Sequence, residues 1–277
     1  MVFNRTARRR VRVHTDYVFA LAPGIGLWTV LAAAGVLGAI IGSFIGAALE
    51  RMPAGRSIVT GRSACDSCGK ALTVQELVPV VSWFLQRGRC RVCDAPIGVW
   101  QIACELGAAA IAMIAVLAAG QAPPLATMVL GWQLLLLALL DLRHLWLPRV
   151  LTGMLAFSGL LLAAARSWVA ADAGALIVAL AGGALGFGML WLVATVYRRA
   201  RGRDGMGGGD PPLMGAIGLW LGPLGVVHCL LGASIVGLLA AGIMHLAGRK
   251  IASDTALPLG TCLAAAALPV FLLQGFA

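Results

Sequence analysis

Two aspartates at the edges of long apolar segments are the residues best suited to catalysis. Asp141 ends an apolar run that begins at Leu134, and Asp210 directly follows the glycine-rich stretch 205–209. Residues 211–248 then contain no Asp, Glu, Lys or Arg. Two neighbouring carboxylates do not both ionise readily, so one of them keeps a proton. The ionised group can activate water while the protonated group donates a proton, which is the chemistry of an aspartic protease.

Both aspartates also have structural interpretations. Asp141 is followed by a short basic stretch, so it fits an ordinary charged loop, and His144 in that stretch either touches the site or is a loop or interface residue. Asp210 and Pro211 together fit the start of a helix, with Asp as the N-cap and Pro at the first helical position. A capping aspartate can still be catalytic, so the two interpretations of Asp210 are compatible.

Four cysteines form two C-x-x-C pairs that are separated by 21 residues. Each pair can supply two thiolates to one tetrahedral zinc ion. Protein would fill all four positions, so such a zinc would be structural and not catalytic. Paired reduced thiols or redox-active thiols are the alternative. We predict a zinc site formed by Cys65, Cys68, Cys90 and Cys93.

The remaining polar and sulfur-bearing residues of the apolar segments carry weaker signals. Cys104, Cys229 and Cys262 are expected to be packing residues. Glu105 is an acid inside an apolar segment, which favours a functional role, although a buried polar partner would also explain it. Tryptophans such as Trp220 fit anchoring at a membrane interface. The sequence contains neither H-E-x-x-H nor G-x-S-x-G, so these motifs of metalloproteases and serine hydrolases are absent.

The composition places these residues in a membrane protein. Hydrophobic residues make up 60% of the 277 residues and charged residues only 12%, with a mean hydropathy of +0.93. Soluble domains carry roughly 25% charged residues. At about 20 residues per membrane-spanning helix, we predict an all-α polytopic membrane protein with about eight transmembrane helices, at residues 24–49, 99–119, 124–141, 147–165, 173–197, 211–227, 229–247 and 256–274.

One long polar stretch and one turn signal divide the chain further. The sixth and seventh predicted helices form a single uncharged run, which Gly222 and Pro223 should interrupt. The only long polar stretch holds the cysteine pairs. We predict a basic tail at 1–23, a first transmembrane helix at 24–49, a cytoplasmic four-cysteine zinc-binding domain at 50–98, and a seven-helix membrane domain at 99–277 that carries the catalytic aspartates.

The positions of Lys and Arg orient the predicted helices. Segment 50–98 contains seven basic residues, and the loops beside Asp141 and Asp210 are also basic. Basic loops lie on the cytoplasmic side of a membrane, so both aspartates are predicted there. The tail 1–23 carries five arginines and favours the opposite orientation, but it is one segment against several. The net charge of +10 is therefore assigned to positively charged cytoplasmic loops of a protein in a lipid bilayer. No basic stretch is interleaved with aromatic residues, so no nucleic-acid partner is expected.

An ordered series of short motifs resembles one known family. The chain is similar to the prepilin peptidases, which are membrane aspartic proteases of the GxGD type. The resemblance covers residues 38 to about 225, and each piece is weak alone whereas the ordered set is highly specific. The matching motifs are Gly42-Ser43-Phe44-Ile45, Arg51-Met52-Pro53, Ser57-Ile58-Val59, both C-x-x-C pairs, Pro79-Val80-Val81-Ser82-Trp83, Arg87-Gly88-Arg89-Cys90, Cys104-Glu105-Leu106, Asp141 to Pro148 with Leu151-Thr152, and Gly205-Met206-Gly207-Gly208-Gly209-Asp210.

The resemblance implies a specific activity. Such enzymes cut the basic leader from type IV prepilins and pseudopilins at the cytoplasmic face of the bacterial inner membrane. Asp141 and Asp210 match the catalytic pair of the family. Many members also methylate the new N-terminal amine with S-adenosylmethionine, and the cysteine-bearing region is associated with that fuller form. The methyl-donor residues remain unknown from the sequence.

Two departures from the family pattern affect these expectations. The family usually has Lys two residues after the second aspartate, where this chain has Pro212, and Asn where this chain has Gly46. Loss of a nearby cation removes one force that favours an ionised carboxylate. A non-catalytic transporter or scaffold for pilin-like helices is the alternative function. It would bind its partner even after both aspartates had been changed to Asn.

Overall fold

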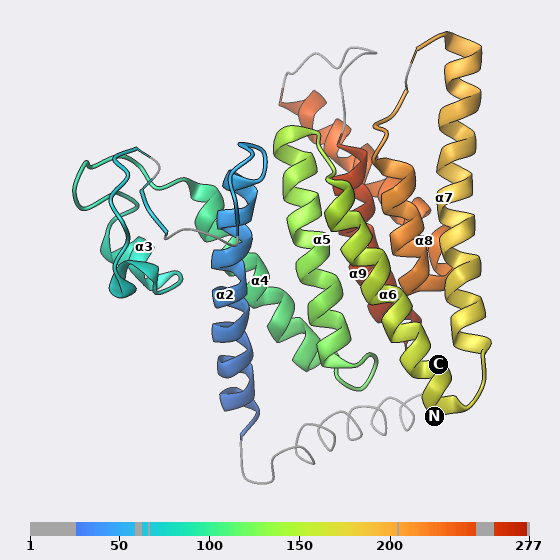
Figure 1. Cartoon of the computed structure of the whole chain (residues 1–277), viewed down its shortest axis with the longest axis horizontal. Coiled ribbons are helices and arrows are strands. Elements are labelled where there is room, and N and C mark those ends of the chain that lie inside the picture. Colours follow the sequence, from blue (N-terminus) through green and yellow to red (C-terminus); the bar gives the residue numbers. More distant parts are fainter. Residues whose placement is uncertain (1–25, 59–62, 66, 204, 248–257, 276–277) are drawn as a thin grey trace. The chain divides into compact units, whose positions relative to one another are not determined.

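The described part of the chain is built from helices. The computed structural model describes residues 26–58, 63–65, 67–203, 205–247 and 258–275 (Figure 1). The predicted tail 1–23 lies outside these residues. The helices are α2 (Leu27–Arg51), η1 (Val74–Leu77), α3 (Val81–Leu85), α4 (Val99–Leu117), α5 (Pro124–His144), α6 (Arg149–Ala170), α7 (Gly174–Arg201), α8 (Asp210–Leu246) and α9 (Leu259–Gln274).

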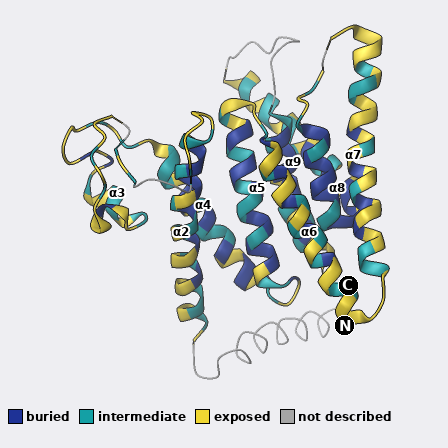
Figure 2. Cartoon of the chain, in the orientation of Figure 1, coloured by how far each residue is buried: buried dark blue, intermediate teal, exposed yellow. Residues whose placement is uncertain are grey.

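Six helices are long and apolar enough to cross a membrane. They are α2, α4, α5, α6, α7 and α8, and α9 is a shorter apolar helix. Many of their large apolar side chains are exposed, as the helix faces in Figure 2 show. In a membrane protein such faces contact lipid, because lipid tails are as apolar as the side chains themselves. The prediction of an all-α, multi-pass membrane protein is therefore confirmed.

The chain divides within α5 into two compact units, residues 1–136 and 137–277. In the first unit, α2 and α4 approach each other through glycine. A Cβ atom added to Gly42 would lie 2.5 Å from the Cα atom of Glu105, and one added to Gly38 would collide with the Ala108 carbonyl. Small residues spaced four apart allow such close helix contacts. The indole N–H of Trp132 on α5 donates to the same Ala108 carbonyl at 3.0 Å, which ties α5 to this pair.

In the second unit, α6, α7, α8 and α9 pack together (Figure 1). Gly218 of α8 faces Gly182 of α7 so closely that a Cβ atom on either would collide with the other backbone. Trp220 of α8 donates its indole N–H to the Leu155 carbonyl of α6 at 2.9 Å. Its ring also packs edge-on against Phe271, with centroids 5.8 Å apart. Trp220 thus joins three helices.

The long element α8 consists of two helical segments that meet at Gly222. Gly222 has φ 67° and ψ −179°, a backbone conformation that only glycine adopts readily. Beyond it, Gly232 lies against Ala266, and Gly237 lies against Cys262 nearer the start of α9. The second segment therefore runs antiparallel to α9. The interruption predicted from Gly222 and Pro223 is confirmed.

The side chain of Gln274, at the end of α9, holds the junction. In its favourable amide orientation it donates to the Leu221 carbonyl at 3.3 Å and accepts from the Gly225 N–H at 3.0 Å. The first segment of α8 therefore ends beside the end of α9. Residues 210–221 span only about 18 Å at 1.5 Å per residue. A bilayer core is about 30 Å thick, so this segment alone is too short to cross it.

Candidate active site and metal centre

Both predicted catalytic aspartates are buried at helix ends in the second unit. Asp141 lies in the last turn of α5, and Asp210 is the first residue of α8. Their exposed fractions are 5% and 4%. The interpretation of Asp141 as an ordinary loop charge is therefore wrong. His144, which follows it at the end of α5, is exposed.

The structure also contradicts a capping role for Asp210. The N-cap position of α8 is Gly209, and Asp210 already belongs to the first turn. A capping carboxylate accepts from backbone N–H groups two or three residues further on. Pro212 has no N–H, and the N–H of Leu213 donates to the Gly209 carbonyl at 3.0 Å. Pro212 therefore removes one of the two possible donors, and the Gly209 carbonyl takes the other.

Leu147 lies between the two aspartates. A Cβ atom added to Gly209, next to Asp210, would lie 2.7 Å from Leu147 Cβ. A Cβ atom added to Gly260 would lie 2.9 Å from Leu147 Cδ1 and 3.0 Å from Asp141 Cγ. Leu147 therefore packs against both the glycine next to Asp210 and the glycine that contacts Asp141. The structure therefore brings the predicted pair together.

Asp141 is held by residues that sequence reasoning missed. Its Oδ2 atom accepts the backbone N–H of Thr261 at 2.7 Å and lies 3.2 Å from the Thr261 hydroxyl. That hydroxyl also donates to the Ala138 carbonyl at 2.9 Å. Thr261 is 120 residues from Asp141, and no motif or spacing in the sequence connects the two.

Glu105, the acid predicted inside an apolar segment, has polar partners in the first unit. Its Oε2 atom accepts the Val80 N–H at 2.6 Å, and its Oε1 atom accepts from Gln101 at 3.0 Å. Val80 has φ 64°, which is strained for a β-branched residue. Glu105 thus fixes an unusual backbone turn, as the buried-partner interpretation predicts. Cys104, Cys229 and Cys262 are buried, as expected for packing residues.

The two cysteine pairs have the same local structure. The Cys65 N–H donates to the Lys70 carbonyl, and the Cys90 N–H donates to the Ala95 carbonyl, each at 2.9 Å. Four residues after the first cysteine of each pair, Gly69 and Asp94 adopt positive φ and donate back to that cysteine. Isolated β-bridges close both turns, between Ala64 and Ala71 and between Arg89 and Pro96. Two matching turns therefore face each other.

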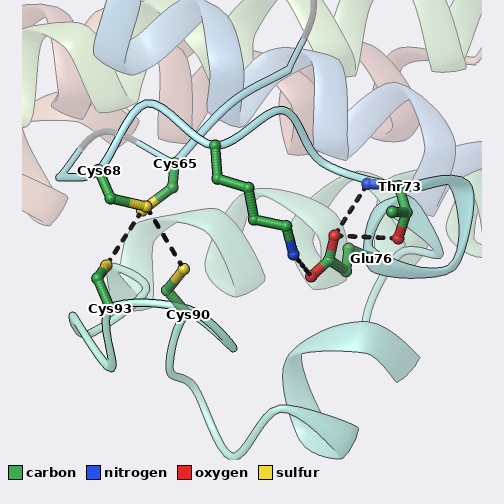
Figure 3. Close-up of polar contacts among 7 residues, drawn as sticks. Cys65, Cys68, Thr73, Glu76, Cys90 and Cys93 are labelled. Carbon is green, nitrogen blue, oxygen red and sulfur yellow. Dashed lines mark hydrogen bonds and ion pairs between the residues drawn. The ribbon is translucent and has the colours of Figure 1, made fainter.

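The four sulfur atoms converge on one point (Figure 3). All lie within 4.8 Å of one another. The Sγ atoms of Cys65 and Cys93 are 3.8 Å apart, and those of Cys68 and Cys90 are 4.0 Å apart. Zinc–sulfur bonds of about 2.3 Å in a tetrahedron place sulfurs about 3.8 Å apart. The predicted cluster is confirmed as a group that could bind a metal.

A buried carboxylate organises the chain between the two pairs (Figure 3). Glu76 Oε1 accepts from the Lys70 ammonium at 2.8 Å, and Oε2 accepts the N–H and hydroxyl of Thr73 at 2.9 and 3.0 Å. The bond from Lys70, followed by the Thr73 N–H, lowers the pKa of Glu76 to about 2. A lowered pKa stabilises the fold above the ordinary carboxyl value, and this contribution is lost as the pH falls toward 2.

Replacing Glu76 with Gln should loosen this segment without touching the cysteines. At pH 7 we expect faster proteolysis of segment 63–97 and faster metal release to a chelator. Asp94→Asn is the control, because it breaks only the exposed pair with Arg89. Equal behaviour of the two variants would contradict the assigned role of Glu76.

A cavity of about 320 Å³ lies in the first unit. The indole N–H of Trp83 on its wall is buried and has no hydrogen-bond partner among the described residues. Gln101 fills the place beside Gly46, where an added Cβ atom would collide with its side chain. An amide group therefore reaches this wall from α4, although position 46 lacks the Asn expected from the resemblance. Polar and acidic lining residues include Ser43, Glu50, Glu76, Gln101 and Glu105.

Two family descriptions match consecutive parts of the chain. Residues 36–119 match the Bacterial Peptidase A24 N-terminal domain, which includes the cysteine pairs. Residues 128–242 match the Type IV leader peptidase family, which includes both aspartates. No solved structure gives a significant match.

Curated relatives match most of the chain. A protein of Burkholderia pseudomallei (strain K96243) named prepilin leader peptidase/N-methyltransferase is 32% identical over 85% of this chain and 82% of its own length. One of the same name from Aeromonas hydrophila is 34% identical over 76% of this chain and 71% of its own length. The type 4 prepilin-like proteins leader peptide-processing enzyme of Escherichia coli O78:H11 is 30% identical over 86% of this chain and 91% of its own length. The chain therefore belongs to the type IV leader peptidase family.

Proposed function

We propose that this protein is a membrane aspartic endopeptidase that cleaves the leader peptide of type IV prepilins or pseudopilins. The observation that carries the proposal is the buried pair Asp141 and Asp210, which meets around Leu147 in the region that matches the peptidase family. The names of the relatives supply the substrate class. Nothing in the described residues favours a transport path over this site.

The dyad can hydrolyse a peptide bond without a nucleophilic side chain. Buried neighbouring carboxylates share one proton, because two charges at short distance repel each other. The ionised carboxylate takes a proton from water, which attacks the scissile carbonyl carbon. The protonated carboxylate stabilises the carbonyl oxygen and then transfers a proton to the leaving amine. Of the glycines before Asp210, Gly208 has no atom within 4 Å of an added Cβ atom, and Gly207 lies beside the Asp210 carboxylate, so a substrate backbone can approach there.

The four cysteines would hold a structural zinc ion. Tetrathiolate chemistry and the sulfur–sulfur distances of 3.8 and 4.0 Å fit tetrahedral zinc. Protein ligands fill all four positions, so the ion would supply rigidity and no reactive water. Segment 50–98 would then be a small zinc-binding domain between the membrane helices at 24–49 and 99–119, and 99–277 would be the membrane domain.

The cavity of the first unit is the best candidate site for a methyl donor. Relatives are named as N-methyltransferases, and this activity requires a donor such as S-adenosylmethionine. The cavity volume is at the lower end of the range for small-molecule sites. Trp83 offers an unpaired N–H and an aromatic face that suits a sulfonium cation, and Glu105 places a carboxylate on the same wall.

The orientation in the inner membrane follows from the basic loops. Seven basic residues in segment 50–98 and the arginines that end α7 support a cytoplasmic position for the cysteine segment and the dyad. The interruption at Gly222 supports eight helical segments, of which the segment 210–221 is too short to cross a membrane alone. Asp210 would then lie below the cytoplasmic surface of the membrane. A prepilin whose helix lies in the membrane could bring its leader junction to this depth.

Purified protein in detergent should cut a prepilin at its leader junction. With S-adenosylmethionine present, the product should be heavier by one methyl group, as read by mass spectrometry. Trp83→Phe should weaken binding of the methyl donor in calorimetry and leave cleavage intact, whereas Trp191→Phe on the exposed face of α7 should change neither. An uncut prepilin that nevertheless binds would favour the scaffold alternative.

A further inference from the structure

Helix α9 begins without a cap of its own. Its N-cap residue is Pro258, and no side chain from that position bonds the first turn. The first N–H groups of a helix have no partner inside the helix. Asp141, on α5, accepts one of them, because its Oδ2 atom lies 2.7 Å from the Thr261 nitrogen. The carboxylate therefore meets the positive end of a helix that is distant in sequence.

The Thr261 hydroxyl adds a second, adjustable contact. It lies 2.9 Å from the Ala138 carbonyl and 3.2 Å from Asp141 Oδ2, and it has only one hydrogen to donate. When Asp141 is ionised, the hydroxyl can turn its hydrogen toward the carboxylate. When Asp141 carries a proton on Oδ2, the Thr261 hydroxyl can accept a hydrogen bond from that O–H and donate its own hydrogen to the Ala138 carbonyl instead. No heavy atom needs to move between these two states.

The geometry assigns Thr261 as a positioning residue of the dyad, an inference that rests on the proposed peptidase function. Its N–H and hydroxyl fix Oδ2 of Asp141, which leaves Oδ1 as the oxygen that meets water and substrate. Gly260 makes these two contacts possible, since a Cβ atom at that position would lie 3.0 Å from both Cγ and Oδ2 of Asp141. Thr261 itself touches no reacting atom.

Two substitutions separate this role from simple helix packing. Thr261→Val keeps the shape and the backbone N–H but removes the hydroxyl, whereas Thr261→Ser keeps the hydroxyl. Leader cleavage is measured with purified protein over a range of prepilin concentrations. We expect kcat to fall about 10- to 100-fold for Val, because a hydrogen bond to a charged group is lost. KM should stay unchanged, and Ser should restore most of kcat.

Thr127→Val is the matched control. Thr127 is fully buried, and its hydroxyl donates to the carbonyl of Pro123, the residue just before its own helix. A full kcat for Thr261→Val would overturn the proposal, as would an equal fall in Thr127→Val. A Thr261→Val loss that Ser fails to restore would also overturn it. Full cleavage by Asp141→Asn would refute the proposed peptidase function itself, whatever Thr261 does.

Discussion

Asp141→Asn and Asp210→Asn should each abolish leader cleavage, with kcat reduced about 10³–10⁴-fold or more. Asparagine keeps the size and one acceptor oxygen of aspartate but neither takes nor releases a proton at neutral pH. Each substitution therefore removes one half of the acid–base pair while the buried site keeps its shape. Cleavage is measured by product mass from purified protein, at saturating prepilin.

The capping geometry makes the Asp141 variants especially informative. Asn caps a helix about as well as Asp, so Asp141→Asn should preserve the bond from Thr261 and the thermal stability of the protein. Asp141→Ala should lose both activity and stability, because it leaves the first turn of α9 unsatisfied. Asp172→Asn is the control, since Asp172 is exposed between α6 and α7. Wild-type cleavage by either Asp→Asn variant at the dyad would refute the mechanism.

Local signals in the sequence predicted the elements and several site residues. Apolar runs located the helices to within a few residues, because each crossing needs its own uncharged segment. The combination of Gly222 and Pro223 predicted the interruption in α8, since glycine alone adopts that backbone conformation readily. The spacing of Cys65, Cys68, Cys90 and Cys93 predicted their convergence, because each pair forms a self-contained turn.

The relations between distant segments could not be predicted in this way. The hydrogen bond from Thr261 to Asp141 depends on how α9 packs against α5, and no local sequence pattern predicts that contact. The capping role assigned to Asp210 failed for a related reason. That prediction considered only the residue types at the helix start. Pro212 has no backbone N–H to donate, and the N–H of Leu213 already donates to the Gly209 carbonyl. Buried hydrogen bonds, more than residue preferences, decide what such a carboxylate can do.

Cys65→Ser and Cys90→Ser, each a single substitution in one of the two cysteine pairs, should have the next largest effect. Each should lower the metal content of the protein and its methylation activity. The described segment between the first and last cysteine is short and contains only the small helices η1 and α3. So small a segment has too little hydrophobic core to fold without a cross-link such as a bound metal ion. Metal analysis of purified wild-type protein should give about one zinc per chain, and each variant should give close to none.

Loss of the metal should affect the two proposed activities unequally. Cys65 and Cys90 line the cavity proposed for the methyl donor, so binding of the donor should fall with the zinc. The dyad, Leu147 and Thr261 all belong to the other compact unit, so residual cleavage should exceed residual methylation. Cys104→Ala is the control, because Cys104 is a buried packing residue on α4 outside the cluster. Retention of one zinc by Cys90→Ser would contradict the four-cysteine site, and unchanged donor binding in a zinc-free variant would separate the cavity from the metal.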